Sequence, residues 1–237
     1  MLELFVRDPF LFTVIIISVV FNYWFKSYSA KKMITMYDKY FQDLSSVGLT
    51  GAATARKLLD ANNLAHVVVE ECSGFLTDHY DSHNKAVRLS TDNFHRPSLV
   101  GVTIAAYEVG HAIQDANRNV MLRIRHSVIG FIMILLKFKL NAILIGLGIV
   151  LMLFTGISSR ALALMLIGIV LLFYLDVVLL LITLAVEKDA SNKAISQMKS
   201  LEMIADNEEK TKMKKILVVA ILIYVLDSVF RIDLSTE

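Results

Sequence analysis

The stretch "HRPSLVGVTIAAYEVGHAIQDANR", residues 95–118, decides the fold, because it is a long apolar segment that carries its own start signal. Pro97 suits the first turn of a helix, so we predict a helix from there to about Asn117. Gly101, Gly110 and four alanines give this helix small side chains, which allow another element to approach its backbone closely. We therefore expect a buried core helix against which other elements pack.

This helix contains the pattern H-E-x-x-H with one of its three defined residues replaced. Glu108 and His111 are present, but Tyr107 stands where the first histidine would be. Positions 107 and 111 are four apart and therefore share one helical face. In a zinc hydrolase, two imidazoles placed in this way bind the metal, and the glutamate moves a proton from zinc-bound water to the leaving amine. A third protein ligand has to come from elsewhere in the chain.

The short motif has ordinary explanations too. By itself His111 is more often a core histidine than a ligand, and Glu108 could stand at a solvated helix edge. Burying Glu108 among apolar residues is costly without a partner, which favours a role for it. The candidate third ligand is Glu187 in "LAVEKDASNKA", residues 184–194, although a surface glutamate is an equally good interpretation from position alone. His79 is the reserve candidate.

The composition is typical of a membrane protein. Hydrophobic residues make up 56% of the 237 residues and gather in long runs. We predict a mainly α integral membrane protein with about four transmembrane helices, at 9–25, 140–156, 161–186 and 216–230. The first run is interpreted as a retained anchor, because acidic residues flank its start and aromatic residues close it.

Positive charges define the expected topology. Lys and Arg concentrate in 26–126 and 187–215, so both segments should face the cytoplasm of a bacterial cell (inner) membrane, with the chain crossing it several times. The expected domains are an N-terminal anchor (1–25), a cytoplasmic α+β domain (26–126), a transmembrane helical hairpin (127–186), a cytoplasmic segment (187–215) and a C-terminal transmembrane helix with a short tail (216–237).

The cytoplasmic domain is expected to contain a small sheet beside the motif helix. Residues 49–64 have helical spacing and a capping Thr50, and 66–71 read as a strand. Two further strands, within 76–81 and 85–90, flank a short polar turn and predict a β-hairpin.

The sequence argues against several functions and against cysteine-based cross-links or metal sites. A net charge of +2 gives no case for a nucleic-acid partner, and the single Cys72 excludes an intrachain disulfide or a cysteine-based zinc cluster. A transporter is a poor fit, since four spans without an internal repeat are few. Asp176 and Asp227, inside expected spans, are better explained as residues that line a polar crevice.

Four blocks of the sequence together resemble one family, the neutral zinc metallopeptidases of bacterial membranes, often called YugP-like. The blocks are "GLTGAATARKLLDANNL" (48–64), "LTDHYDSHNKAVRLS" (76–90), "VGVTIAAYEVGHAIQDA" (100–116) and "VEKDASNKA" (186–194). They occur in family order, and the resemblance covers nearly the whole chain. It implies a zincin-like domain and an endopeptidase of the H-E-x-x-H plus distal glutamate type that binds one zinc ion.

The resemblance also assigns roles to individual residues. It makes Glu108 the catalytic general acid/base, His111 a zinc ligand and Glu187 the distal ligand. Asp189 and Ser191 match positions that could orient ligands. Three hairpin residues match a family block without an assigned role, for which substrate positioning by strand addition is one possibility; they are His79, Tyr80 and Asp81.

Tyr107 departs from the family, as does Ala185 where a proline is usual. An unperturbed phenol ionises near pH 10, so tyrosine is a poor substitute for a histidine ligand. Three explanations stay open: a substitution in an otherwise active enzyme, a natural pseudoenzyme, or a tyrosinate ligand. The predicted function is a zinc metalloendopeptidase that cleaves peptides or membrane proteins at the cytoplasmic surface of the bilayer, impaired by Tyr107. The alternative is an inactive pseudoprotease that binds a protein partner.

Overall fold

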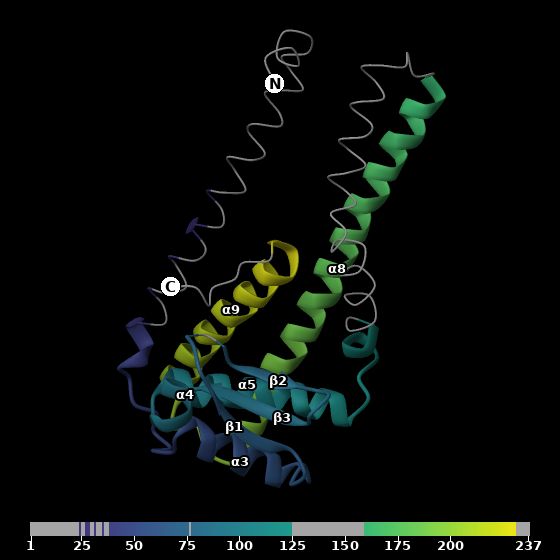
Figure 1. The fold of residues 1–237 in the computed structure, drawn as a ribbon. Helices are drawn as coiled ribbons and strands as arrows, with labels where there is room; N and C mark the ends of the chain where they lie inside the picture. The colour runs from purple at the N-terminus through teal and green to yellow at the C-terminus, as the bar shows by residue number, and fades with distance from the viewer. Residues whose placement is uncertain are drawn as a thin grey trace.

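The computed structural model describes residues 38–75, 77–124 and 159–230, with a few isolated residues before 38. Within the two long C-terminal helices, side chains are described over 178–222 apart from 179. The helices are α3 (Gly51–Ala61), α4 (Thr91–His95), α5 (Leu99–Ala116), α8 (Ser159–Ser200) and α9 (Asn207–Phe230). The strands are β1 (Val68–Cys72), β2 (His79–Asp81) and β3 (Ala86–Ser90). Figure 1 shows α5 crossing between the small sheet and the lower ends of α8 and α9.

Helix α5 is the centre of the fold. Ser98 caps its start by accepting a hydrogen bond from the Gly101 amide, and Asn117 ends it, close to the predicted limits. Every residue over 99–114 is buried. The helix packs against α3, α8, α9 and the strands β2 and β3, as expected for a core helix with small residues on its surface.

The sheet has three strands in the order β1-β3-β2. The predicted hairpin is confirmed: β2 and β3 are antiparallel, with Tyr80 opposite Val87. The predicted strand at 66–71 is present as β1, but it pairs in parallel with β3, which the sequence did not indicate. Helix α3 is also confirmed, and the Thr50 side chain accepts a hydrogen bond from the Ala53 amide at its start.

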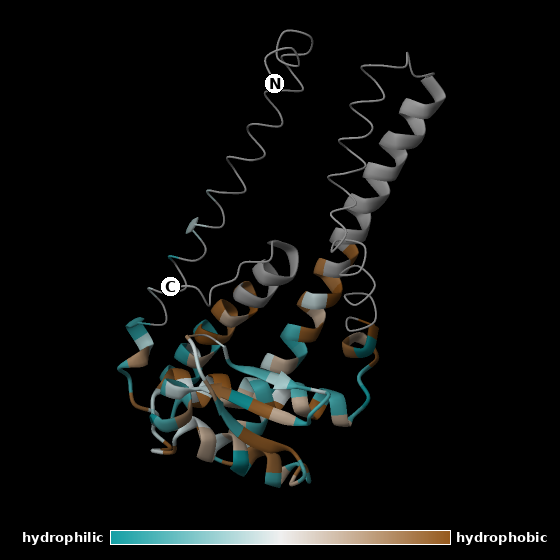
Figure 2. Ribbon diagram, viewed as in Figure 1, coloured by the Kyte–Doolittle hydropathy of each residue, from teal (hydrophilic) through white to brown (hydrophobic). Residues whose placement is uncertain are grey.

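The predicted integral membrane architecture is corrected by the structure. In the part of the chain that it describes, no helix is long and apolar enough to cross a membrane, and the arrangement is α+β. The expected spans at 161–186 and 216–230 lie within α8 and α9, and each of these helices also has a polar part, beyond Val186 and before Ile216 respectively. In Figure 2, the coloured lower parts of α8 and α9 carry both hydrophobic and hydrophilic residues. The expected spans at 9–25 and 140–156 lie outside the described residues, apart from Trp24.

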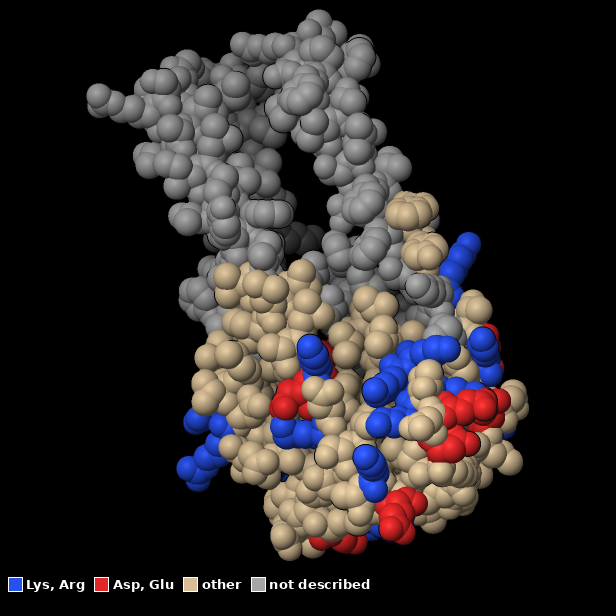
Figure 3. Space-filling model, turned by 180° about the vertical axis from the view of Figure 1, so that it is seen from behind, with Lys and Arg blue, Asp and Glu red and all other residues tan. Residues whose placement is uncertain are grey.

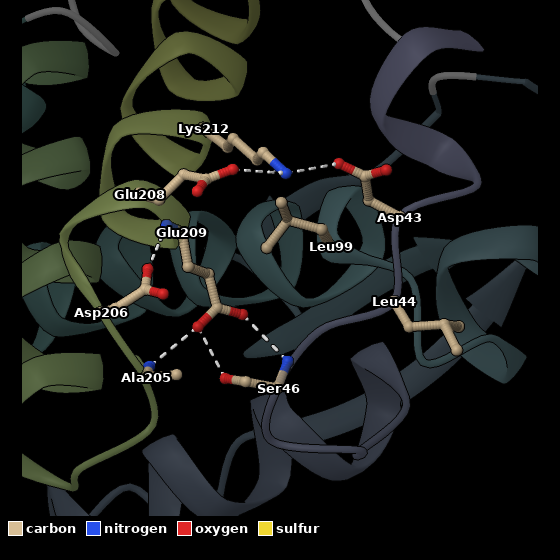
Figure 4. A pocket seen from close by; sticks show the side chains of 9 residues that line it. All are labelled: Asp43, Leu44, Ser46, Leu99, Ala205, Asp206, Glu208, Glu209 and Lys212. Carbon is tan, nitrogen blue, oxygen red and sulfur yellow. Dashed lines mark hydrogen bonds and ion pairs between the residues drawn. The ribbon is translucent and has the colours of Figure 1, made fainter.

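The connection between α8 and α9 is tied to the segment before α3 by one carboxylate. Glu209 accepts hydrogen bonds from the Ser46 amide (2.9 Å), the Ser46 hydroxyl (2.6 Å) and the Ala205 amide (2.8 Å). Beside it, Lys212 forms ion pairs with Asp43 and Glu208 (Figure 4). These contacts line a cavity of about 380 Å³ and fix the start of α9 against the N-terminal side of the domain.

The contact between α5 and α8 depends on Gly110. A Cβ atom at this position would lie 2.5 Å from the carbonyl oxygen of Ala190, which belongs to the backbone of α8 and cannot rotate away. The missing side chain therefore brings the two helices close enough for Glu187 on α8 to reach α5.

We predict that Gly110→Ala destabilises the protein, although alanine is the better helix former. The overpacking cost of about 1–3 kcal/mol should outweigh the roughly 1 kcal/mol that alanine gains over glycine inside a helix. Thermal unfolding of the two proteins measures the difference. A melting temperature that is unchanged or higher in the variant would contradict the tight α5–α8 contact.

Candidate active site

The candidate site is formed by two helices. Helix α5 contributes Tyr107, Glu108 and His111, and α8 contributes Glu187 eighty positions after Tyr107. All four are buried: Tyr107 and Glu187 are 0% exposed, Glu108 1% and His111 8%. The structure thus brings together residues that the sequence placed far apart.

Glu187 is held by the two residues that share the α5 face. The Tyr107 hydroxyl donates a hydrogen bond to Glu187 Oε2. His111 Nε2 lies 3.3 Å from the same oxygen. The rings of Tyr107 and His111 meet edge to face, with centroids 4.8 Å apart. Tyr107 and His111 therefore both approach the same carboxylate oxygen of Glu187.

Gln114 fixes the orientation of His111. The amide nitrogen of Gln114 donates to the carbonyl of Val186 and to the carboxylate of Asp189, both at 2.8 Å, and neither group can donate in return. The amide oxygen must therefore face His111 Nδ1, 2.9 Å away, and accept a hydrogen bond from its N–H. In the neutral imidazole this leaves the lone pair on Nε2, the nitrogen that lies 3.3 Å from Glu187.

Asp189, predicted to orient ligands, lies behind Gln114. It also accepts hydrogen bonds from Asn119 (3.2 Å) and Lys193 (2.6 Å). Burial alone would raise the pKa of Asp189, but the hydrogen bonds from Lys193 and Gln114 lower it below its ordinary value. Asp189 therefore acts on His111 through Gln114. Gln114 itself was missed, although its position three residues after His111, on the same helical face, was a usable signal.

Glu108 lies on another flank of α5. Its charge helps to raise the pKa of the Cys72 thiol on β1, although burial of the thiol contributes more. The carboxylate is therefore close to the sheet, while Tyr107 and His111 contact α8. The solvated-edge interpretation of Glu108 is wrong, since the residue is buried.

Ser191 takes no part in the hydrogen bonds around Glu187 that the described chain shows. Its side chain is buried, and its hydroxyl has no hydrogen-bond partner among the residues that the structure describes. The residue lines a groove between α8 and α9. Its predicted part in orienting ligands has no contact in the described chain to support it.

The three hairpin residues make their hydrogen bonds within the hairpin and to the end of α5. His79 is exposed and bonds the Thr77 carbonyl (2.7 Å), so the structure does not bring this reserve ligand to the site. The Tyr80 hydroxyl donates to Asp115 (2.8 Å), and burial, followed by this bond, raises the pKa of Tyr80. Asp81 closes the turn, and hydrogen bonds from Asn84, foremost, and from Arg88 lower its pKa.

Asp78, which the sequence analysis did not single out, is a buried anchor beside His79. It accepts hydrogen bonds from the Ser90 amide (2.8 Å), the Ser90 hydroxyl (3.1 Å) and Asn93 (3.0 Å). Burial raises the pKa of Asp78 and outweighs these bonds, which lower it. The residue holds the start of β2 to the end of β3 and to α4.

The donor set does not fit a zinc site of the H-E-x-x-H plus glutamate type. Such a site needs three protein ligands around one ion. Here His111 and Glu187 are two suitable metal ligands, while the third position holds a phenol whose hydroxyl donates a hydrogen bond to Glu187. Among the described residues, no group of three or more His, Cys, Asp or Glu is placed to hold a metal.

Comparison with known proteins identifies the lineage. The family model described as "Putative neutral zinc metallopeptidase" matches residues 11–233. The chain belongs to this family. It is also 36% identical over 195 residues to the "Putative membrane protease YugP" of Bacillus subtilis (strain 168), which covers 82% of this chain and 81% of that protein. No solved structure matches the chain significantly. The family description implies zinc, in contrast to the donor set found at Tyr107.

We predict that Glu187 makes stability depend on pH. Burial raises its pKa from the ordinary 4.5 to about 8. The folded chain therefore keeps a proton that the unfolded chain releases, so this contribution is full below pH 4.5 and is lost as the pH rises to about 8. In Glu187→Gln the neutral amide does not titrate. Melting temperatures measured across this range should shift in favour of the variant as the pH rises, and a constant difference would contradict the prediction.

Proposed function

We propose that this chain is a zinc metalloendopeptidase of the H-E-x-x-H plus distal glutamate type whose metal binding is impaired by Tyr107. The proposal depends on one observation: His111 Nε2 and Glu187 Oε2 are both buried and lie 3.3 Å apart. The two residues belong to two helices, and each lies in one of the family motifs. In this assignment His111 and Glu187 are metal ligands, and Glu108 is the general acid/base.

The proposed substrate is a polypeptide, either a free peptide or a segment of a membrane protein. The strand order leaves β2 at an edge of the sheet, and β2 packs beside α5. An extended segment could add to this edge through main-chain hydrogen bonds, next to the helix that carries Glu108. His79, Tyr80 and Asp81 would then position it. The name of the B. subtilis relative supports membrane association, which we propose for this chain as well.

A second candidate is a pseudoprotease that binds a protein partner without cleaving it. The hydrogen bond between Tyr107 and Glu187 favours it, because the carboxylate is already satisfied by a protein donor. In that case capture of a client by the unmodified chain should be insensitive to chelators, whereas a metal-dependent enzyme should lose its activity on chelation.

We predict that Tyr107→His restores the third ligand. The purified variant should contain about one zinc per chain and cleave peptides, while Tyr107→Phe, which removes the hydroxyl without adding a ligand, should bind no zinc. Metal analysis and a peptide-cleavage assay measure the two properties.

Adding Glu108→Gln to the histidine variant provides the control for chemistry. Zinc content should persist while cleavage falls by about 10²–10⁴-fold, because the proton carrier is lost. A Tyr107→His protein that neither binds zinc nor cleaves any peptide would rule out the enzyme assignment.

A further inference from the structure

A groove between α8 and α9 forms a cavity of about 390 Å³ beside the candidate site. It lies on a different flank of α8 from Ala190, which packs against Gly110 of α5. Four lysines line it, and no acidic residue does. They are Lys188, Lys199, Lys210 and Lys214.

The positive charge of this groove is not compensated by the described part of the chain. None of its four lysines forms an ion pair with a described carboxylate. Neighbouring lysines outside the groove do: Lys193 on α8 pairs with Asp189 at 2.6 Å, and Lys212 on α9 pairs with Asp43 at 3.2 Å. On the face seen from behind, Figure 3 shows Lys and Arg side chains together with patches of Asp and Glu on a surface that otherwise carries neither. The groove therefore favours a ligand with negative charge.

The same groove has an apolar wall. Ile195 of α8 and three residues of α9 line it: Leu217, Val218 and Ile221. Val218 is 56% exposed. Exposed apolar residues continue from the groove along both helices, away from their connection; they are Leu181, Leu184 and Leu222. The lining thus runs from lysines at the connection, where Lys199 and Lys210 lie, to an open apolar strip.

We propose that this groove binds an anionic phospholipid, with its phosphate among the lysines and an acyl chain along the apolar wall. Lysine acts as a point charge that suits phosphate, and four lysines line this groove. A hydrocarbon chain also accounts for the apolar strip that leaves the groove, which an acidic peptide does not need. The proposal concerns a site separate from the peptidase assignment.

The test uses the full chain in an uncharged detergent and a short-chain phosphatidylglycerol as the probe. Lys214→Gln should weaken its binding about fivefold, the effect of one lysine near an anionic lipid. Lys215→Gln is the matched control, because Lys215 is an exposed neighbour on α9 outside the groove, and it should bind as the unmodified chain does. Short-chain phosphatidylcholine should bind more weakly to all three proteins.

A second variant tests the apolar wall. Val218→Asn changes an exposed side chain and should weaken phosphatidylglycerol binding about threefold, while leaving the binding of inorganic phosphate unchanged. Equal losses in Lys214→Gln and Lys215→Gln would overturn the proposal, as would phosphate or a polyglutamate peptide binding as tightly as the lipid. These variants leave Tyr107, Glu108, His111 and Glu187 intact, so failure here would not bear on the peptidase assignment.

Discussion

The burial of the Glu187 carboxyl group against α5 is the constraint on which this structure depends. A carboxyl group removed from water is costly unless it finds polar partners; here the Tyr107 hydroxyl donates a hydrogen bond to it, and His111 Nε2 lies 3.3 Å away. The contact is possible because Gly110 lets the backbone of α8 approach α5. Gln114 then secures the arrangement by joining His111 to the same turn of α8. The site and the helix packing are therefore one structural unit.

The presence of tyrosine at position 107 changes what joins the helices. In the zinc site that the family motif implies, a metal would connect α5 and α8 through ligands from both. In this chain a hydrogen bond from a phenol links them, and the remaining polar groups stay matched: Gln114 with Asp189, and Asp189 with Lys193. Among the described residues, Glu187 is thus surrounded by a polar network whose members are hydrogen-bonded to one another.

Local signals predicted the local elements well. Thr50 and Pro97 marked the starts of two helices, and the polar turn after Asp81 marked the hairpin, because caps and turns depend on a few neighbouring residues. The parallel pairing of β1 with β3 was missed, since strands separated by a crossover leave no short-range signature. The membrane architecture was wrong: apolar runs were interpreted as spans, yet in the described chain no helix is long and apolar enough to cross a membrane.

The candidate site was predictable in part. Tyr107, His111 and Glu187 were named from sequence and lie together, yet their roles stay predictions. Ser191 shows the limit of the approach: it shares a helical face with Glu187, yet in the described chain its hydroxyl has no hydrogen-bond partner and the residue lines the groove between α8 and α9. Spacing along one helix specifies a face, whereas the identity of the neighbour on that face depends on tertiary packing.

Glu209 has a mechanical consequence. Its two carboxylate oxygens hold donors from Ser46 and Ala205, which are far apart in the chain. The Glu209 side chain therefore holds the segment ahead of α3 and the beginning of α9 together. A pull on the chain before Leu49 would therefore act on α9 through Glu209. It would then reach α8, which packs against both α9 and α5.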